Sequence, residues 1–164
     1  MKTKNIQILF ISILFILVYF LNINNSYSLE HEYPGVLLYM FSHFNLMHLF
    51  VNLLSFIVIY KAVDEPFLFL KMWIVAVLSG IGSIAILPTM GCSGMIVGMF
   101  GLFLSQVINH RLKIVDKKQF TIYVLSFVFF LIICLFNRNI NNLNHIIALI
   151  IGFSYGYFKY YKGE

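Results

Sequence analysis

The sequence predicts an all-α membrane protein, in which one domain over residues 1–164 forms a bundle of six transmembrane helices. Three observations predict this class. Hydrophobic residues make up 61% of the chain and charged residues only 10%, whereas soluble domains have about 45–50% apolar and about 25% charged residues. The apolar residues gather into six long stretches, and almost all basic residues flank the same set of stretch ends. The composition therefore excludes a soluble globular domain, a disordered chain and a disulfide-rich scaffold.

The six apolar stretches cover residues 6–21, 46–63, 66–88, 93–109, 119–136 and 143–161. Polar or turn-forming segments separate them, at 22–28, 64–66, 88–91, 110–118 and 137–142. Inside lipid the backbone must satisfy its own hydrogen bonds, so only helices and closed barrels span a membrane. Barrel strands alternate in polarity over about 10 residues, whereas these stretches are longer and continuously apolar. We therefore expect six helices, with Pro66 in the first turn of the third.

The first stretch is also compatible with a secretory signal peptide. Lys2 and Lys4 give it a basic start, and Ser26-Tyr27-Ser28 resembles a cleavage site. However, its apolar run is long for a signal peptide, and the five helices that follow need a partner in the bundle. The interpretation favoured by these features is an uncleaved helix.

The basic residues predict the orientation of the bundle. If the N-terminus is cytoplasmic, ten of the eleven Lys and Arg residues lie at cytoplasmic helix ends, and only Arg138 lies at an outer end. Cytoplasmic loops of membrane proteins carry such an excess of basic residues. We therefore expect a multi-pass protein of the cell membrane with both termini cytoplasmic and residues 22–45 outside. The net charge of +5 is then a topology signal, and no nucleic-acid partner is expected. The ten are residues 2, 4, 61, 71, 111, 113, 117, 118, 159 and 162, and Lys71 is expected to extend to the inner surface without a functional role.

Three groups of polar residues lie at the starts of membrane-spanning helices, where apolar residues are normally found. They are His43 to Asn52 at the second helix, Gly91 to Gly94 at the fourth, and Asn144-His145 at the sixth. Polar and ionisable groups in such segments cost about 2.5–3.5 kcal/mol on insertion scales and mark functional sites. In the predicted topology these three helices all run from outside to inside, so the three groups share one depth. This agreement predicts a single composite site.

The residue types at this site suit acyl transfer. Ser93 becomes a nucleophile only if a base takes its proton, and His145 is a base with an ordinary pKa near about 6.5. The six acidic residues lie in loops or at the C-terminus, which predicts a Ser-His dyad rather than a triad. His48 and Asn52 are four residues apart, so they share a helix face, and two neighbouring donors suit an oxyanion hole.

Two glycines flank the proposed nucleophile, and several of these residues also have structural explanations. Gly91 and Gly94 allow a tight backbone turn around Ser93 and close approach of another chain. Gly94, Gly98 and Gly101 also form a stripe of small residues that suits helix packing. His48 and Asn52 could instead be interhelical hydrogen-bond partners, and His145 could be structural. His43 is either a site residue or a surface histidine, and the loop histidines at 31 and 110 are expected to have no role in the site.

The cysteines predict neither a disulfide nor a metal site. Cys92 and Cys134 both lie in apolar surroundings, without the spacing of paired cysteines or metal ligands. Cys92, next to Ser93, is an alternative nucleophile, but adjacent residues on a turn point in different directions. No cofactor or metal is expected.

Taken together, the chain resembles the rhomboid intramembrane serine proteases. The resemblance covers residues 5–161 and rests on His43-x4-His48-x3-Asn52, on Gly91-x-Ser93-Gly94 with Gly98 and Gly101, and on His145 with Gly152. It implies a six-helix bundle of rhomboid type with Ser93 as nucleophile, His145 as base, His48 and Asn52 in the oxyanion hole, and His43 in support. Its implied substrates are single-span membrane proteins in a lipid bilayer; oligomeric state is not indicated.

The sequence departs from the family pattern at three places. Ala148 stands where a glycine is usual, which could widen the contact between the fourth and sixth helices. Val97 stands where an aromatic residue commonly stacks on the base, and the first outer loop lacks a Trp-Arg pair. A catalytically silent rhomboid-like protein that binds membrane helices is the alternative function, but silent relatives typically lose the serine or the histidine.

Overall fold

The described residues of the computed structural model, 2–21, 35–83, 88–109, 117–136 and 140–161, are organised into helices. Their bounds are α1 Lys2–Phe20, α2 Gly35–Leu38, the 3-10 helix η1 Tyr39–Phe41, α3 Leu46–Ala62, α4 Leu68–Ser83, α5 Ser93–Ile108, α6 Lys117–Phe136 and α7 Asn142–Tyr161. The all-helical class is thus confirmed. Six of these helices match the six apolar stretches, whereas α2 and η1, within residues 22–45, were not predicted.

The start of α4 differs from the expectation. Pro66 was expected in its first turn, but the helix begins at Leu68. The reason is local, because Phe67 has a φ of 54°, in the left-handed region that a right-handed helix cannot include. Asn45 sets the start of α3 more conventionally, since its side-chain oxygen accepts a hydrogen bond of 2.8 Å from the His48 N–H.

The lengths of the described helices bear on the number of membrane spans. Thr3–Phe20 of α1 is long and apolar enough to cross a membrane, and Gly35–Phe41 with Leu46–Ala62 gives a second candidate if this pair, bent by 86°, is one span. Leu68–Ser83, Ser93–Ile108 and Phe120–Ile133 are apolar but shorter. The count of six spans therefore stays a prediction.

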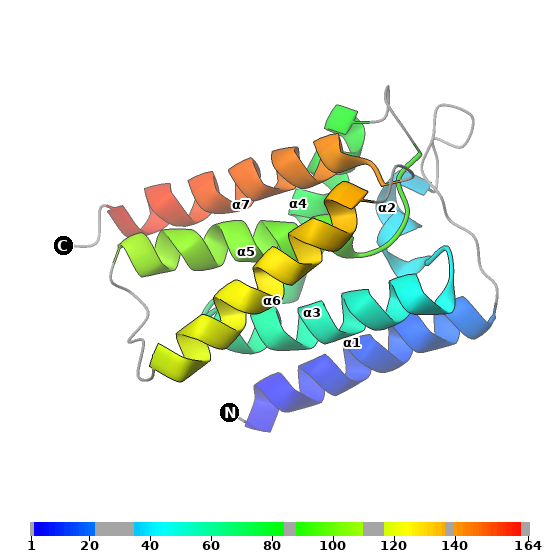
Figure 1. Ribbon diagram of the computed structural model, residues 1–164, viewed down its shortest axis with the longest axis horizontal. Coiled ribbons are helices and arrows are strands. Elements are labelled where there is room, and N and C mark those ends of the chain that lie inside the picture. The colour runs from blue at the N-terminus through cyan, green and yellow to red at the C-terminus, as the bar shows by residue number, and fades with distance from the viewer. Residues whose placement is uncertain (1, 22–34, 84–87, 110–116, 137–139, 162–164) are drawn as a thin grey trace.

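Helix α5 lies at the centre of the bundle. It packs against α7, α4 and α3, while α1 and α6 each pack on α3 (Figure 1). Twelve of its sixteen residues are buried. In Figure 1, α3, α5 and α7 all start on the right and end on the left, and α1 and α6 run the opposite way. The starts of α3, α5 and α7 therefore meet at one end of the molecule, as the three polar groups in the sequence predicted.

Glycines bring α5 and α7 into backbone contact. A Cβ atom added at Gly152 of α7 would lie 2.8 Å from the carbonyl carbon of Gly98 in α5, and one at Gly101 would lie 2.7 Å from the amide nitrogen of Phe153. Real Cβ atoms essentially never approach other atoms this closely, so these positions admit only glycine without a shift of the helices. The small-residue stripe predicted in the sequence is therefore a packing surface, and it fixes the separation of the two helices that carry Ser93 and His145.

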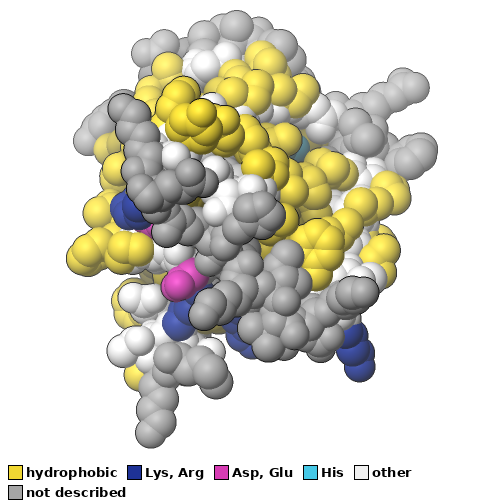
Figure 2. All heavy atoms as spheres, turned by 90° about the vertical axis from the view of Figure 1, so that its left-hand side faces the viewer, with side chains coloured by type: hydrophobic (Ala, Val, Ile, Leu, Met, Phe, Trp, Pro, Cys, Tyr) yellow, Lys and Arg dark blue, Asp and Glu magenta, His cyan; other side chains and the backbone are white. Residues whose placement is uncertain are grey.

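The opposite end of the bundle is basic. The five lysine side chains that the structure describes, at residues 4, 61, 71, 118 and 159, lie towards this end, where α1 starts and α7 finishes. Figure 2 looks directly at it and shows basic side chains beside a largely hydrophobic surface. Lys4 ties α1 to the end of α3 by donating hydrogen bonds to the carbonyl oxygens of Lys61 and Val63. The gathering of basic groups at one end agrees with the predicted charge asymmetry.

Glu65, between α3 and α4, is buried at this basic end. Its side chain has no exposed surface, and it accepts hydrogen bonds from Lys71 of α4 and from Tyr155, Lys159 and Tyr160 of α7. Lys159 bonds both carboxylate oxygens, at 2.6 and 2.7 Å. Burial raises the pKa of the carboxyl, but the hydrogen bonds from the two lysines and two tyrosines outweigh it and lower the pKa from 4.5 to about 2. This ion-pair network was not predicted, and Lys71 was expected to have no functional role.

Candidate active site

Ser93 and His145 meet where α5 and α7 begin. The Ser93 Oγ lies 2.8 Å from the His145 Nε2, within hydrogen-bond distance. Ser93 is the first residue of α5 and is partly exposed, while His145, in the first turn of α7, is 6% exposed. Because a neutral imidazole accepts through the nitrogen that carries no proton, Nε2 is able to accept the serine proton. The two residues singled out as nucleophile and base are therefore in direct contact.

No carboxylate completes this pair among the described residues. The His145 Nδ1 is buried without a hydrogen-bond partner, and Glu65, the buried acid, lies at the other end of the molecule. This arrangement agrees with a dyad. Within the described residues, the groups that orient the imidazole are therefore not carboxylates.

His48 and Asn52 converge on the backbone next to Ser93. Gly91 has a φ of +95°, a conformation that side chains rarely adopt. A Cβ placed on it would lie 2.8 Å from the His48 Nε2 and 3.2 Å from the Asn52 Nδ2. Both nitrogens thus lie close to one point beside the start of α5. Gly91 is needed here for two reasons, its positive φ and the space that these two side chains occupy.

The protonation of His48 follows from its other nitrogen. The Phe44 N–H donates to the His48 Nδ1 at 3.3 Å, so in the neutral ring the proton sits on Nε2. Asn52 is 1% exposed, and its Nδ2 has no hydrogen-bond partner. Two N–H donors are therefore directed to the region around Gly91, one of them without a partner, as an oxyanion hole requires.

His43 and Cys92 form a second contact behind this region. The Cys92 Sγ lies 3.6 Å from the His43 Nε2, and the His43 ring packs edge-on against His48 with centroids 5.2 Å apart. His43 is 7% exposed and Cys92 is fully buried. His43 is therefore not a surface histidine but is buried against His48. The thiol of Cys92 contacts His43, whereas the Ser93 hydroxyl contacts His145, which favours Ser93 over Cys92 as the nucleophile.

A buried polar network holds the start of α7. The Ser79 Oγ of α4 donates to the Asn144 Oδ1 at 3.0 Å, and the Asn144 Nδ2 donates to the Tyr39 hydroxyl at 3.4 Å. Asn141 donates in the same way to the Ser83 and Thr89 hydroxyls, at 3.1 and 3.0 Å. Gly94 makes room for Asn144, because a Cβ there would lie 2.5 Å from the Asn144 Oδ1. The network was not predicted, although Ser79 and Ser83, four residues apart in an apolar helix, were a visible signal.

Phe130 of α6 is a further site neighbour that sequence reasoning missed. Its ring lies 6.0 Å from the His145 ring, tilted by 55°. It also forms a small hydrophobic cluster with Val97 of α5. No polarity pattern distinguishes it from the other apolar residues of α6.

The remaining sequence expectations divide into three groups. Ala148 is fully buried, and Ser93 and His145 are within hydrogen-bond distance with it in place. No group of three or more His, Cys, Asp or Glu side chains within the described ranges could hold a metal ion. His31, His110 and the Cys134 side chain lie outside the described residues.

Comparison with known proteins identifies one family. The family model described as Rhomboid domain matches residues 30–162, most of the chain. No curated protein and no solved structure gives a match.

Proposed function

The chain belongs to the rhomboid family, and on that premise we propose that it is an intramembrane serine endopeptidase that cleaves peptide bonds in or near the transmembrane helices of other proteins. Members of this family are membrane proteins. The observation that carries the proposal is the Ser93 Oγ to His145 Nε2 distance of 2.8 Å, beside the two convergent donors of His48 and Asn52. A serine and an imidazole in contact, next to N–H donors, are what acyl transfer requires.

Acylation uses these groups in order. As the Ser93 Oγ attacks the carbonyl carbon of the scissile bond, its proton moves to the His145 Nε2. The carbonyl oxygen gains negative charge, and the His48 Nε2–H and Asn52 Nδ2–H stabilise it. When the carbon–nitrogen bond breaks, the imidazolium returns the proton to the leaving amine, so the first product leaves neutral and Ser93 carries an ester.

Deacylation repeats the same steps with water. The His145 Nε2 takes a proton from a water molecule as its oxygen attacks the ester carbon, and the same two donors stabilise the oxyanion. Collapse breaks the bond to the Ser93 Oγ, which regains the proton from the imidazolium. The second product is a carboxylic acid, and the enzyme is unchanged after the cycle.

The test is covalent labelling by a fluorophosphonate probe together with cleavage of a single-span reporter. We expect the purified protein to react with the probe, and we expect Ser93→Ala to abolish both labelling and cleavage. A protein that is folded in detergent but neither labels nor cleaves any of a panel of reporters would favour the silent, helix-binding alternative. Cleavage lost in Cys92→Ala but retained in Ser93→Ala would assign the nucleophile to Cys92.

The proposal includes a membrane topology. Lysines gather at the end of the bundle remote from Ser93, which supports both termini in the cytoplasm and the site near the outer surface of the cell membrane. Cysteines introduced at Glu30 and at Lys162 test it on intact cells with an impermeant thiol reagent. Labelling is expected at position 30 alone, and labelling at position 162 alone would reverse the topology.

The proposed substrates follow from the depth of the site. A transmembrane helix keeps its carbonyl groups in internal hydrogen bonds because lipid offers no other partner, so the helix must open before Ser93 can attack. Opening is easier near the outer interface, where water enters. We therefore propose single-span substrates with an outer N-terminus, a helix weakened by Gly, Pro or small polar residues near its outer end, and a small residue before the cut. A reporter with a Leu-rich helix is the control, and preferential cleavage of that control would remove helix opening as the selecting step.

A further inference from the structure

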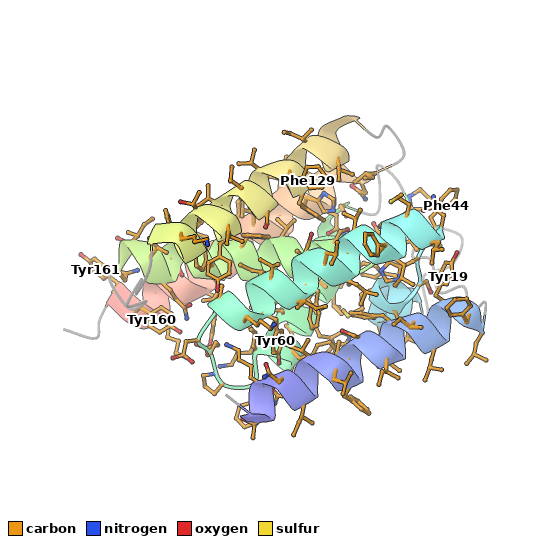
Figure 3. All side chains as sticks on the ribbon, turned by 60° about the horizontal axis from the view of Figure 1, so that its bottom comes forward. Tyr19, Phe44, Tyr60, Phe129, Tyr160 and Tyr161 are labelled. Atoms are coloured by element: carbon orange, nitrogen blue, oxygen red, sulfur yellow. The ribbon has the colours of Figure 1, made fainter. Side chains whose placement is uncertain are left out.

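A buried side chain of α6, Phe130, lies against His145, the proposed base. Phe130 is 2% exposed, and no other side chain described in α6 is fully buried. Its neighbour Phe129 is 62% exposed and points outward from the same helix turn (Figure 3). The Phe130 ring is 6.0 Å from the His145 ring, a separation at which aromatic rings attract each other.

Phe130 belongs to a row of aromatic residues on α6 that pack on aromatic rings of α5 and α7. Phe120 and Tyr123 pack on Phe103 of α5, with centroids 6.3 and 5.7 Å apart, and Phe127 stacks on Phe100 at 4.1 Å. These residues are spaced by three or four, so they share one face of α6 with Phe130. Only at the last level does the partner change from an α5 phenylalanine to His145.

The imidazole of His145 has few other restraints. Its Nε2 faces Ser93, and its Nδ1 is buried without a hydrogen-bond partner. A ring held by one hydrogen bond can still rotate about its side-chain bonds unless neighbouring atoms prevent it. Phe130 is the aromatic ring in contact with the imidazole. It is itself held in an apolar cluster with Val97, against which Val51, Ile140 and Leu149 pack.

We infer that Phe130 is a positioning residue: its ring, inserted from α6 beside Val97, keeps the His145 imidazole aimed at Ser93. The inference rests on the proposed protease function for its catalytic consequence, but the orientation of the imidazole is a physical property that can be measured without it. The ring does this by shape, because it has no polar atom that could take part in the proton transfers.

A volume-conserving exchange within the cluster tests this. Phe130→Val removes the ring, and Val97→Phe in the same chain restores a ring to the cluster from α5. In Phe130→Val we expect kcat per folded molecule to fall about 10- to 100-fold, as small displacements of catalytic groups do, with KM within about threefold. The double variant should recover a large part of that loss, because the two positions share one space and their effects are not additive. Phe127→Val, one turn away on Phe100, is the matched control and should lower the thermal midpoint without lowering kcat.

A second measurement does not depend on cleavage. The Phe130 ring current shifts the ring-proton NMR signals of His145, so these signals should move in Phe130→Val and move again in the double variant. If the wild type does not cleave any reporter but the His145 signals shift as expected in the variants, the protease proposal is refuted and the positioning role of Phe130 remains.

Three outcomes overturn the inference. Unchanged or faster cleavage by Phe130→Val would show that the ring is not needed or that it obstructs substrate. If the double variant is stably folded but its kcat remains as low as that of Phe130→Val, Phe130 contributes to packing alone. Unmoved His145 signals in Phe130→Val would show that the ring does not restrain the imidazole. If Phe130→Val does not fold, Phe130→Leu, which keeps most of the volume but not the planar ring, is judged by the same criteria.

Discussion

Gly152→Ala is expected to slow catalysis from a position two helical turns away from His145. A Cβ at Gly152 would lie 2.8 Å from the Gly98 carbonyl carbon and 3.0 Å from its Cα, and ordinary contact begins near 3.4 Å. The carbonyl carbon alone requires the two helices to separate by about 0.6 Å, and the Gly98 carbonyl oxygen, which would lie nearer still, requires more. Both partners in the clash are backbone, so no side-chain rotation relieves it.

The separation reaches the site because α7 is a continuous helix. If α7 moves as one body, the Ser93–His145 contact lengthens from 2.8 Å towards about 3.4 Å, beyond the range of a good hydrogen bond. We expect kcat to fall about 10- to 100-fold. The overpacking should cost about 1–3 kcal/mol, partly offset by about 1 kcal/mol of better helix propensity for alanine.

The assay is kcat on a single-span reporter, the rate of labelling by a fluorophosphonate probe, and the thermal midpoint in detergent. Gly82→Ala in α4 is the matched control, because its Cβ would meet only the movable end of Ile147, at 3.0 Å. It should retain the wild-type rate. A Gly152→Ala protein that labels and cleaves like wild type would refute the view that the α5–α7 backbone contact sets the distance between Ser93 and His145.

Three further predictions concern single groups. Ser93→Ala and His145→Ala should each abolish cleavage, and the double variant should be no worse than either, since the two act as a unit; additive losses would contradict this. Asn52→Ala should lower kcat by up to about 10²–10³ with little change in KM, because the charge it stabilises develops only in the transition state; an unchanged kcat would return Asn52 to a packing role. Glu65 has a folded-state pKa of about 2, below its ordinary 4.5, so its stabilisation is complete above about pH 5 and is lost as pH falls towards 2. Glu65→Gln should therefore lower the thermal midpoint at pH 7 and make the midpoint fall less steeply as the pH is lowered. Thermal unfolding measured from pH 7 to pH 3 tests this. If the midpoint of the variant falls as steeply with pH as that of the wild type, Lys159 and its neighbours do not hold the carboxylate in its charged form.

The sequence predicts the helices and the meeting of the site residues because both depend on local signals. Polar and turn residues interrupt the apolar stretches, and the alternation of direction places the starts of α3, α5 and α7 together. The contact between Ser93 and His145 follows from that order. The short helix α2 lacked such a signal, because its four residues, Gly35–Leu38, are too few to show a helical repeat.

Glu65 and Phe130 escaped prediction for two different physical reasons. Glu65 follows α3 in the sequence and looks like a solvated loop acid, but α4 and α7 bring two lysines and two tyrosines around it, and no local pattern encodes contacts between residues 90 or more positions apart. Phe130 was missed because the residues of α6 are so similar in polarity. Helix α6 is apolar on every side, so polarity does not separate the face that packs on protein from the face that would meet lipid. Phe129 and Phe130 are the same residue type, yet one is 62% and the other 2% exposed.

Among the described residues no carboxylate lies beside His145, the proposed base, and this gives these packing contacts a common role. In a triad, an acid holds the imidazole in position through a hydrogen bond. In the described part of this chain, that function falls to the helix that carries the base. Asn144 fixes the start of α7 to α4, Gly152 fixes its middle to α5, and Lys159 fixes its end to Glu65. A helix held at three levels cannot easily slide or tilt, so the backbone of His145 is set by packing, and only the rotation of its ring is left for Phe130 to restrain. A dyad can therefore keep its geometry without a third polar member, provided that the helix bearing the base is rigid.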